Sequence, residues 1–130
     1  MTQTKDPVIR TSPTLSDLNL NGHIFGGWVL SQMDIAGGIT AGRLARGKVA
    51  TVAIEGMKFF KPILVGDVVS VYADITKVGR TSITIEMEVI ASRGRSQKQV
   101  RVTEGTYIYV AIDDNANPRP VDPDKGEVSV

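Results

Sequence analysis

The sequence predicts an α+β fold in which one long helix packs against an antiparallel sheet of about five strands. A segment of about eighteen residues beside a glycine pair has apolar side chains at helical spacing. Most of the remaining chain consists of stretches bounded by glycines and prolines. In some of them apolar and polar residues alternate, as in a strand with one buried face, and in others the residues of both faces are apolar, as in a strand covered on both sides. A length of 130 residues, without internal repeats, fits a single domain.

The chain begins with a polar segment over residues 1–7, which we expect to be frayed. A short edge strand is predicted over residues 8–11. Pro13 and Asp17 break this strand, because both residue types favour turns. The loop that follows carries Asn19.

The central helix is predicted from Gly27 to Leu44 or Ala45, because Gly47 provides a stop signal. Apolar residues occur on nearly all its sides, which predicts burial in the core. Asp34 is the exception, since a carboxylate in such a helix loses hydration unless it finds a partner. A helical glycine costs about 1 kcal/mol relative to alanine, so we expect another backbone or a ligand to approach closely at the interior glycines. These are Gly37, Gly38 and Gly42.

Antiparallel strands follow the helix. The cleanest alternation, over residues 81–92, predicts a strand with one buried face. Gly56 predicts a bulge or a close backbone approach. Residues 113–130 are polar, contain three prolines and are expected to be loose, with the domain core over about residues 8–121 and the tail over 122–130. The expected strands span residues 48–61, 68–78, 81–92 and 100–112.

The composition excludes several kinds of site. The chain has no cysteine, which excludes disulfides, thiolate metal sites and a cysteine nucleophile. Its single histidine cannot form a histidine-rich cluster, so no metal is expected. A formal net charge of +1 gives no reason to expect a nucleic-acid partner. Without a signal peptide or a long apolar run, the expectation is a cytoplasmic protein that does not insert into a membrane.

The most informative stretch surrounds the start of the helix. Gly26 and Gly27 let the backbone approach a ligand and present N–H groups that no helical carbonyl accepts. Such groups favour a bound anion or an oxyanion that develops during a reaction. The carboxylate of Asp34 suits the role of a base or a nucleophile. The side-chain amide of Asn19 suits the role of holding water or orienting a carbonyl. The alternative for Asp34 is a structural carboxylate whose hydrogen bonds are satisfied by backbone groups. The alternative for Asn19 is an Asx-turn.

An ordered series of motifs extends this stretch over nearly the whole chain, from about Val8 to Val121. It resembles the hotdog-fold acyl-CoA thioesterases, most closely their YciA-like branch. The fold name, in which a sheet wraps one helix, is an implication of this resemblance. The motifs are Asn19-x-x-Gly22-x-Ile24-Phe25-Gly26-Gly27-Trp28, Ser31-Gln32-Met33-Asp34, Val52-x-x-Glu55-Gly56-Met57-x-Phe59-x-x-Pro62, Val65-Gly66-Asp67-Val68-Val69, Gly79-x-Thr81-Ser82 and Pro118-Arg119-Pro120.

The resemblance implies a hydrolase that cleaves acyl-CoA to a free acid and coenzyme A, without a metal or an organic cofactor. By position, it implies that Asn19 and Asp34 form the active pair and that the Gly27 N–H lines the oxyanion site. Asp34 would act as general base or as nucleophile. Contacts to the coenzyme A part of the substrate are expected at Gly26, Phe59, Lys61, Gly79, Arg80, Thr81, Ser82 and Arg119.

The spacing of the proposed groups predicts a dimer. Asp34 follows Gly27 by seven residues, which places them about 10 Å apart along one helix. Both groups must lie within about 3 Å of one reacting thioester. Two copies of the helix, packed antiparallel about a two-fold axis, satisfy this requirement, with Gly37 and Gly38 allowing close approach. The resemblance further implies a trimer of such dimers.

Two other functions remain open from the sequence. The first is a hotdog hydratase or dehydratase, although the His-Phe-Pro and Asp-x-x-x-x-His motifs of those relatives are absent. The second is a non-catalytic acyl-CoA binder, for which a carboxylate near the thioester has no use. Many relatives have His-Gly-Gly where this chain has Phe25-Gly26-Gly27, so a histidine-dependent mechanism is not expected. Activity on enoyl thioesters alone would identify the first alternative, and tight binding without thiol release the second.

Overall fold

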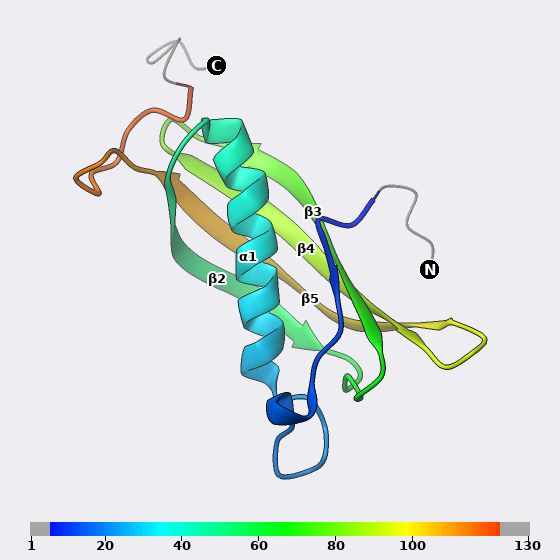
Figure 1. Cartoon of the computed structure of the whole chain (residues 1–130). Coiled ribbons are helices and arrows are strands. Elements are labelled where there is room, and N and C mark those ends of the chain that lie inside the picture. Colours follow the sequence, from blue (N-terminus) through cyan, green and yellow to red (C-terminus); the bar gives the residue numbers. More distant parts are fainter. Residues whose placement is uncertain (1–5, 123–130) are drawn as a thin grey trace.

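The computed structural model describes residues 6–122 of the chain, and the expectations for residues 1–5 and 123–130 lie outside this range. A short strand and a 3₁₀ turn precede one long helix and four long strands (Figure 1). The elements are β1 (Ile9–Thr11), η1 (Leu15–Asp17), α1 (Gly26–Ala45), β2 (Val49–Phe59), β3 (Val68–Val78), β4 (Ser82–Arg93) and β5 (Lys98–Ala111). The predicted order of elements is therefore confirmed, and the strand ends differ from prediction by about two residues, as is usual.

The five strands form one sheet in the order β1-β3-β4-β5-β2, and every neighbouring pair is antiparallel. Figure 1 shows α1 lying across one face of this curved sheet, with β2 at one edge. The predicted α+β hotdog architecture, with a single helix wrapped by the sheet, is confirmed. No helix in the described range is long and apolar enough to cross a membrane.

The core lies between α1 and the concave face of the sheet. Alternating residues of β4 contribute to it as the sequence pattern predicts, since Ile83, Ile85 and Val89 are fully buried. Gly56 has a φ of +61° beside a register shift between β2 and β5, so the predicted bulge is present.

The helix is buried on one side only, contrary to the expectation of burial all round. Its side toward the sheet includes Met33 and Ala36, both fully buried, whereas Ile35 is 50% exposed and Ile39 is 37% exposed. Its apolar pattern is wider than the surface that one sheet covers. Gly37 is required by packing within the chain, because a Cβ there would lie 2.2 Å from the hydroxyl oxygen of Tyr109.

The expectation that the whole segment after β5 is loose is wrong for residues 113–121. Ile112 forms a β-bridge with Pro118, the Val121 N–H donates to the Arg80 carbonyl at 2.9 Å, and Val121 is buried. The Arg119 guanidinium donates to three backbone carbonyls, which fix the segment against the end of α1. These contacts could not be predicted from the polar composition of the segment, because most of them are made to backbone groups.

Candidate active site

The start of α1 presents free backbone donors. Phe25 is the N-cap residue, with extended backbone (ψ 151°) and no side-chain hydrogen bond to the first turn. The N–H groups at the start of a helix have no intrahelical acceptor, and the helix dipole adds positive potential there. Gly26 and Gly27 are exposed. Their positions therefore suit an anion or the oxygen of a polarised carbonyl.

The loop before the helix is organised by Asn19. Its Oδ1 accepts hydrogen bonds from the backbone N–H groups of Asn21 at 2.8 Å and His23 at 3.1 Å. Its own backbone N–H donates to the His23 carbonyl at 2.7 Å. The Asx-turn that the sequence left as an alternative is thus present. Because the side-chain oxygen belongs to this turn, the carboxamide NH2 is the part of Asn19 that suits a ligand.

A cavity of about 290 Å³ connects this loop with the end of β2. Four of the predicted site residues line it together, which are Asn19, Gly26, Phe59 and Lys61. Its remaining walls are mostly apolar, and Ile24, Val29 and Ile63 among them are buried. The cavity thus offers apolar space beside the helix start, with one lysine at its border.

Asp34 lies two turns further along α1 and is held by two hydroxyl groups. Thr51 of β2 donates a hydrogen bond from Oγ1 to Asp34 Oδ1 at 2.6 Å. Tyr109 of β5 donates to the same Oδ1 at 3.0 Å. No lysine or arginine within residues 6–122 pairs with Asp34. The carboxylate is therefore oriented by neutral donors, and Oδ2 is left for other contacts.

Tyr107 and Tyr109 of β5, whose hydroxyl groups contact α1, keep their hydroxyl protons at neutral pH. Burial, followed by the hydrogen bond and charge of Asp34, raises the pKa of Tyr109 well above its ordinary value. Burial and the charge of Asp34 raise the pKa of Tyr107 to about 12. The low polarity of the site and the nearby carboxylate both disfavour a phenolate. Tyr109 is therefore a hydrogen-bond donor to Asp34 throughout the physiological range.

Sequence reasoning missed Thr51 and Tyr109. Thr51 lies in a strand whose two faces are both largely apolar, and one threonine in a strand carries no signal of its own. Tyr107 and Tyr109 alternate at core positions, which is the available hint, because buried tyrosines usually find a hydrogen-bond partner. The partner depends on the register that sets Thr51 opposite Tyr109, which the pattern of one strand does not contain.

The other predicted contacts lie elsewhere in the chain. Gly79 and Arg80 line a separate cavity of about 220 Å³ near Leu44, at the far end of α1. Thr81 follows this turn and Ser82 begins β4, and the Thr81 carbonyl accepts the Ala111 N–H at 2.9 Å. Within one chain, the structure therefore does not bring these four residues to the helix start.

Arg119 lies at the end of α1. Its guanidinium donates to the carbonyls of Ile112, Pro120 and Ala45 at 3.0, 3.0 and 2.9 Å. The contact with Ala45 satisfies one of the carbonyls left free at the end of α1. These bonds engage all three guanidinium nitrogens, so Arg119 has a structural role in this chain, and its expected contact with the substrate stays a prediction.

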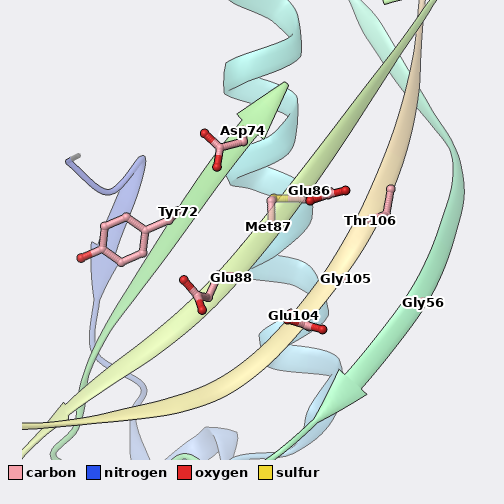
Figure 2. Close-up of a pocket in the computed structure, with 9 residues that line it drawn as sticks. All are labelled: Gly56, Tyr72, Asp74, Glu86, Met87, Glu88, Glu104, Gly105 and Thr106. Atoms are coloured by element: carbon pink, nitrogen blue, oxygen red, sulfur yellow. The ribbon is translucent and has the colours of Figure 1, made fainter. Parts of the chain in front are cut away.

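A further depression, with a volume of about 350 Å³, lies on the sheet. Figure 2 shows its lining residues, with α1 behind the sheet. Four carboxylates line it, those of Asp74, Glu86, Glu88 and Glu104. Arg101 pairs with both Glu88 and Glu104. The excess of negative charge does not suit a phosphorylated ligand. Among the described residues, no group of three or more His, Asp or Glu side chains is arranged to hold a metal ion.

One long helix wrapped by a five-stranded antiparallel sheet defines a class, that of the hotdog-fold proteins. Residues 21–98, more than half of the chain, match the Thioesterase superfamily. The chain is 48% identical over 117 residues to "Acyl-CoA thioester hydrolase YciA" of Salmonella typhimurium, covering 88% of each sequence. The chain therefore belongs to the thioesterase superfamily, as a YciA-like member.

Solved structures agree with this assignment. An aspartate-to-alanine variant of HI0827, "a hexameric broad specificity acyl-coenzyme A thioesterase", superimposes with a TM-score of 0.88 at 42% identity, covering 95% of this chain and 91% of that one. Cj0915 of Campylobacter jejuni, "a hexameric hotdog fold thioesterase", gives 0.87 at 36% identity and covers 92% of each chain. The likeness extends over nearly the whole chain and is not limited to the motifs.

Proposed function

We propose that this chain hydrolyses acyl-CoA by means of Asp34 and a helix-start oxyanion site, and that the two are contributed by different copies of the chain. The acyl-CoA thioesterase activity follows from its relatives, which are acyl-CoA thioester hydrolases and match nearly the whole chain. The mechanism and the residue roles are the proposal. The observation that supports them most directly is the orientation of the Asp34 carboxylate by two hydroxyl donors.

The reaction needs a group that attacks the thioester carbonyl and a donor for the oxygen that gains charge. As general base, Asp34 takes a proton from water, whose oxygen attacks the carbonyl carbon while the C=O electron pair moves to oxygen. The Gly27 N–H then donates to this oxyanion. When the intermediate collapses, the C–S bond breaks and the proton passes to the coenzyme A thiolate. As nucleophile, the Asp34 carboxylate would instead attack the carbonyl carbon and expel the coenzyme A thiolate, which leaves a mixed anhydride. Water then cleaves the anhydride to the free acid and the Asp34 carboxylate, and the released proton goes to the thiolate.

The separation along α1 supports a shared site. Gly27 and Asp34 are about 10 Å apart on one rigid helix, whereas both must contact one thioester. An antiparallel pair of helices sets the start of one beside the middle of the other. Each dimer then holds two equivalent sites, as two-fold symmetry requires.

Exposed apolar residues support a face for this dimer. Ile35 and Ile39 on α1 are 50% and 37% exposed, and Val52 and Ile54 on the edge strand β2 are 58% and 44% exposed. An edge strand with exposed apolar side chains favours pairing with another strand. A Cβ at Gly38, which lies beside Ile39 on α1, would meet nothing within 4 Å in the chain. This part of the helix thus has room for a second helix.

The higher assembly is proposed by likeness. HI0827 and Cj0915 are both described as hexameric, and the same assembly here would be a trimer of dimers. In the antiparallel dimer, the turn with Gly79 and Arg80 approaches the helix start of the partner subunit, because it lies at the far end of α1. We therefore propose coenzyme A contacts from Gly26, Phe59 and Lys61 of one subunit and from residues 79–82 of the other.

The test is a thiol-release assay on acyl-CoAs of graded chain length, with wild type and Asp34→Asn. Wild type should release thiol from saturated acyl-CoA, and Asp34→Asn should lose at least about 100-fold in kcat while remaining folded and able to bind coenzyme A. Near-normal turnover by Asp34→Asn would remove this residue from the mechanism. Hydration of enoyl-CoA without thiol release would identify a hydratase, and binding without either reaction a binder.

A further inference from the structure

The Tyr109 hydroxyl shares its one proton between two oxygens of Asp34. Its hydroxyl lies 3.0 Å from the backbone carbonyl oxygen of Asp34 and 3.0 Å from Asp34 Oδ1. The ring is 1% exposed and is stacked on Tyr107 at a centroid distance of 6.3 Å. A buried, stacked ring has little freedom to move, so its hydroxyl is a fixed reference point behind the carboxylate.

Gly37 makes this contact possible. A Cβ at residue 37 would lie 2.2 Å from the Tyr109 hydroxyl oxygen and 2.8 Å from two carbons of its ring. Any other residue would push the ring away from the helix. Gly37 lies in the interior of the helix, three residues after Asp34. It thus leaves the space in which Tyr109 reaches Asp34.

The contact acts together with Thr51. Thr51 and Tyr109 are directly opposite each other in the β2·β5 pairing, and both donate to Oδ1 of Asp34. Two donors from adjacent strands fix the rotation of the carboxylate about its side-chain bonds. The second oxygen, Oδ2, is consequently held in one direction.

We infer that Tyr109 is a positioning residue for the hydrolysis, which sets the orientation of the Asp34 carboxylate without touching the substrate. This inference rests on the proposed function, because it presupposes that Asp34 takes part in the reaction. Misplacing a reacting group by about 1 Å can lower a rate by roughly 100-fold, whereas substrate binding depends on other contacts. Loss of the Tyr109 hydroxyl should therefore lower kcat and leave KM nearly unchanged.

The chain offers a matched control in Tyr107. Its hydroxyl donates to the Leu30 carbonyl oxygen at 2.8 Å, one helical turn before Asp34, and within residues 6–122 it forms no hydrogen bond with the Asp34 carboxylate. Tyr107→Phe and Tyr109→Phe each remove one buried hydroxyl that donates to the backbone of α1. Only Tyr109→Phe removes a donor to the carboxylate.

The experiment compares kcat, KM and the thermal midpoint of both variants, Asp34→Asn and wild type as full-length protein. We expect kcat of Tyr109→Phe to fall roughly 10- to 100-fold with KM within about twofold of wild type. Tyr107→Phe should keep kcat within about twofold, while the two thermal midpoints fall by similar amounts. Gly37→Ala, which keeps the hydroxyl but displaces the ring, should lower kcat in the same way as Tyr109→Phe.

Equal kcat values for Tyr109→Phe and Tyr107→Phe would overturn the positioning role. If Asp34→Asn is inactive in that experiment, the proposed function is retained and only the role of Tyr109 is lost. If Asp34→Asn is active, both the proposed function and the role of Tyr109 are wrong. A change confined to KM of Tyr109→Phe would also contradict the inference, because it would indicate a substrate contact.

Discussion

Thr51 Oγ1 donates to Asp34 Oδ1 over 2.6 Å, the shortest hydroxyl-to-carboxylate contact that the structure gives for Asp34. It joins the edge strand β2 to the middle of α1, and Thr51 itself is exposed in the single chain. This hydrogen bond therefore ties the orientation of the carboxylate to the edge strand.

Two replacements of Thr51 should separate the effect of its hydroxyl on kcat from the effect of its side-chain shape. Thr51→Val keeps the branched side chain but removes the donor, so kcat should fall by roughly 10- to 100-fold. Thr51→Ser keeps the donor and should retain most activity. Steady-state kinetics on one acyl-CoA are sufficient. If valine and serine variants have the same kcat, the hydroxyl does not orient Asp34.

Gly38 tests the helix–helix contact of the proposed dimer. A Cβ there meets nothing within 4 Å in the single chain, so Gly38→Ala should be tolerated in the fold. A leucine would separate two helices that approach at this position, and we expect Gly38→Leu to shift the protein towards monomer and to lose turnover. Light scattering after gel filtration, with circular dichroism as the control for folding, measures both effects. A Gly38→Leu protein with wild-type mass and activity would exclude a helix contact there.

Stability at high pH should report the buried tyrosines. The folded-state pKa of Tyr107 is raised to about 12, above the unfolded value near 10. Above pH 10 the unfolded chain loses the tyrosine proton first, so the free energy of unfolding falls as pH rises from about 10 to 12, by up to about 1.4 kcal/mol per pH unit. Below pH 10 this contribution is fully present.

Urea unfolding of wild type and Tyr107→Phe at pH 9, 10 and 11 should measure this dependence. Tyr107→Phe lacks this hydroxyl, and its loss also removes the charge interaction that contributes to the raised pKa of Tyr109, so the variant should have the shallower slope. Identical slopes would mean that Tyr107 titrates alike in the folded and unfolded chains.

Arg119 should affect stability and not substrate affinity. Arg119→Met keeps most of the aliphatic stem but removes the donors to three backbone carbonyls, including that of Ala45. Unsatisfied carbonyls of this kind cost about 1–3 kcal/mol. Chemical denaturation should show this loss, with KM for acyl-CoA within about twofold of wild type. A large rise in KM at unchanged stability would return Arg119 to the substrate site.

The fold was largely predictable because its signals are local. The alternation over β4 and the glycine-bounded helix each specify one element, and a single helix with antiparallel strands permits few arrangements. The ordered segment over residues 113–121 was not predictable. Arg119 and the backbone of Val121 hold it through carbonyl contacts that leave no pattern in the sequence.

The candidate site could be predicted only where a single loop or helix carries its residues, and the roles of these residues stay predictions. Asn19, Gly26 and Gly27 follow from the helix start, and Asp34 from its polarity in an apolar helix. The donors Thr51 and Tyr109 depend on the register between β2 and β5, which is set by tertiary pairing. The distance from Gly27 to Asp34 was available at once, because helix geometry fixes it.

The most direct test of a site shared between subunits is a mixing experiment with two inactive variants. Gly27→Pro removes the N–H donor in the first turn of the helix, where no intrahelical hydrogen bond is lost. A Cβ at this position would lie 2.9 Å from the Phe25 ring, so circular dichroism must show that the variant is folded. Asp34→Asn removes the carboxylate. Each homo-oligomer should be inactive, whereas a mixed dimer holds one site with both native groups. Refolding equal amounts together should restore about a quarter of wild-type kcat per chain, since about half of randomly formed dimers are mixed and each has one of two sites intact. If the mixture stays as inactive as its components while mixed dimers are present, each chain carries its own site and the shared arrangement is wrong.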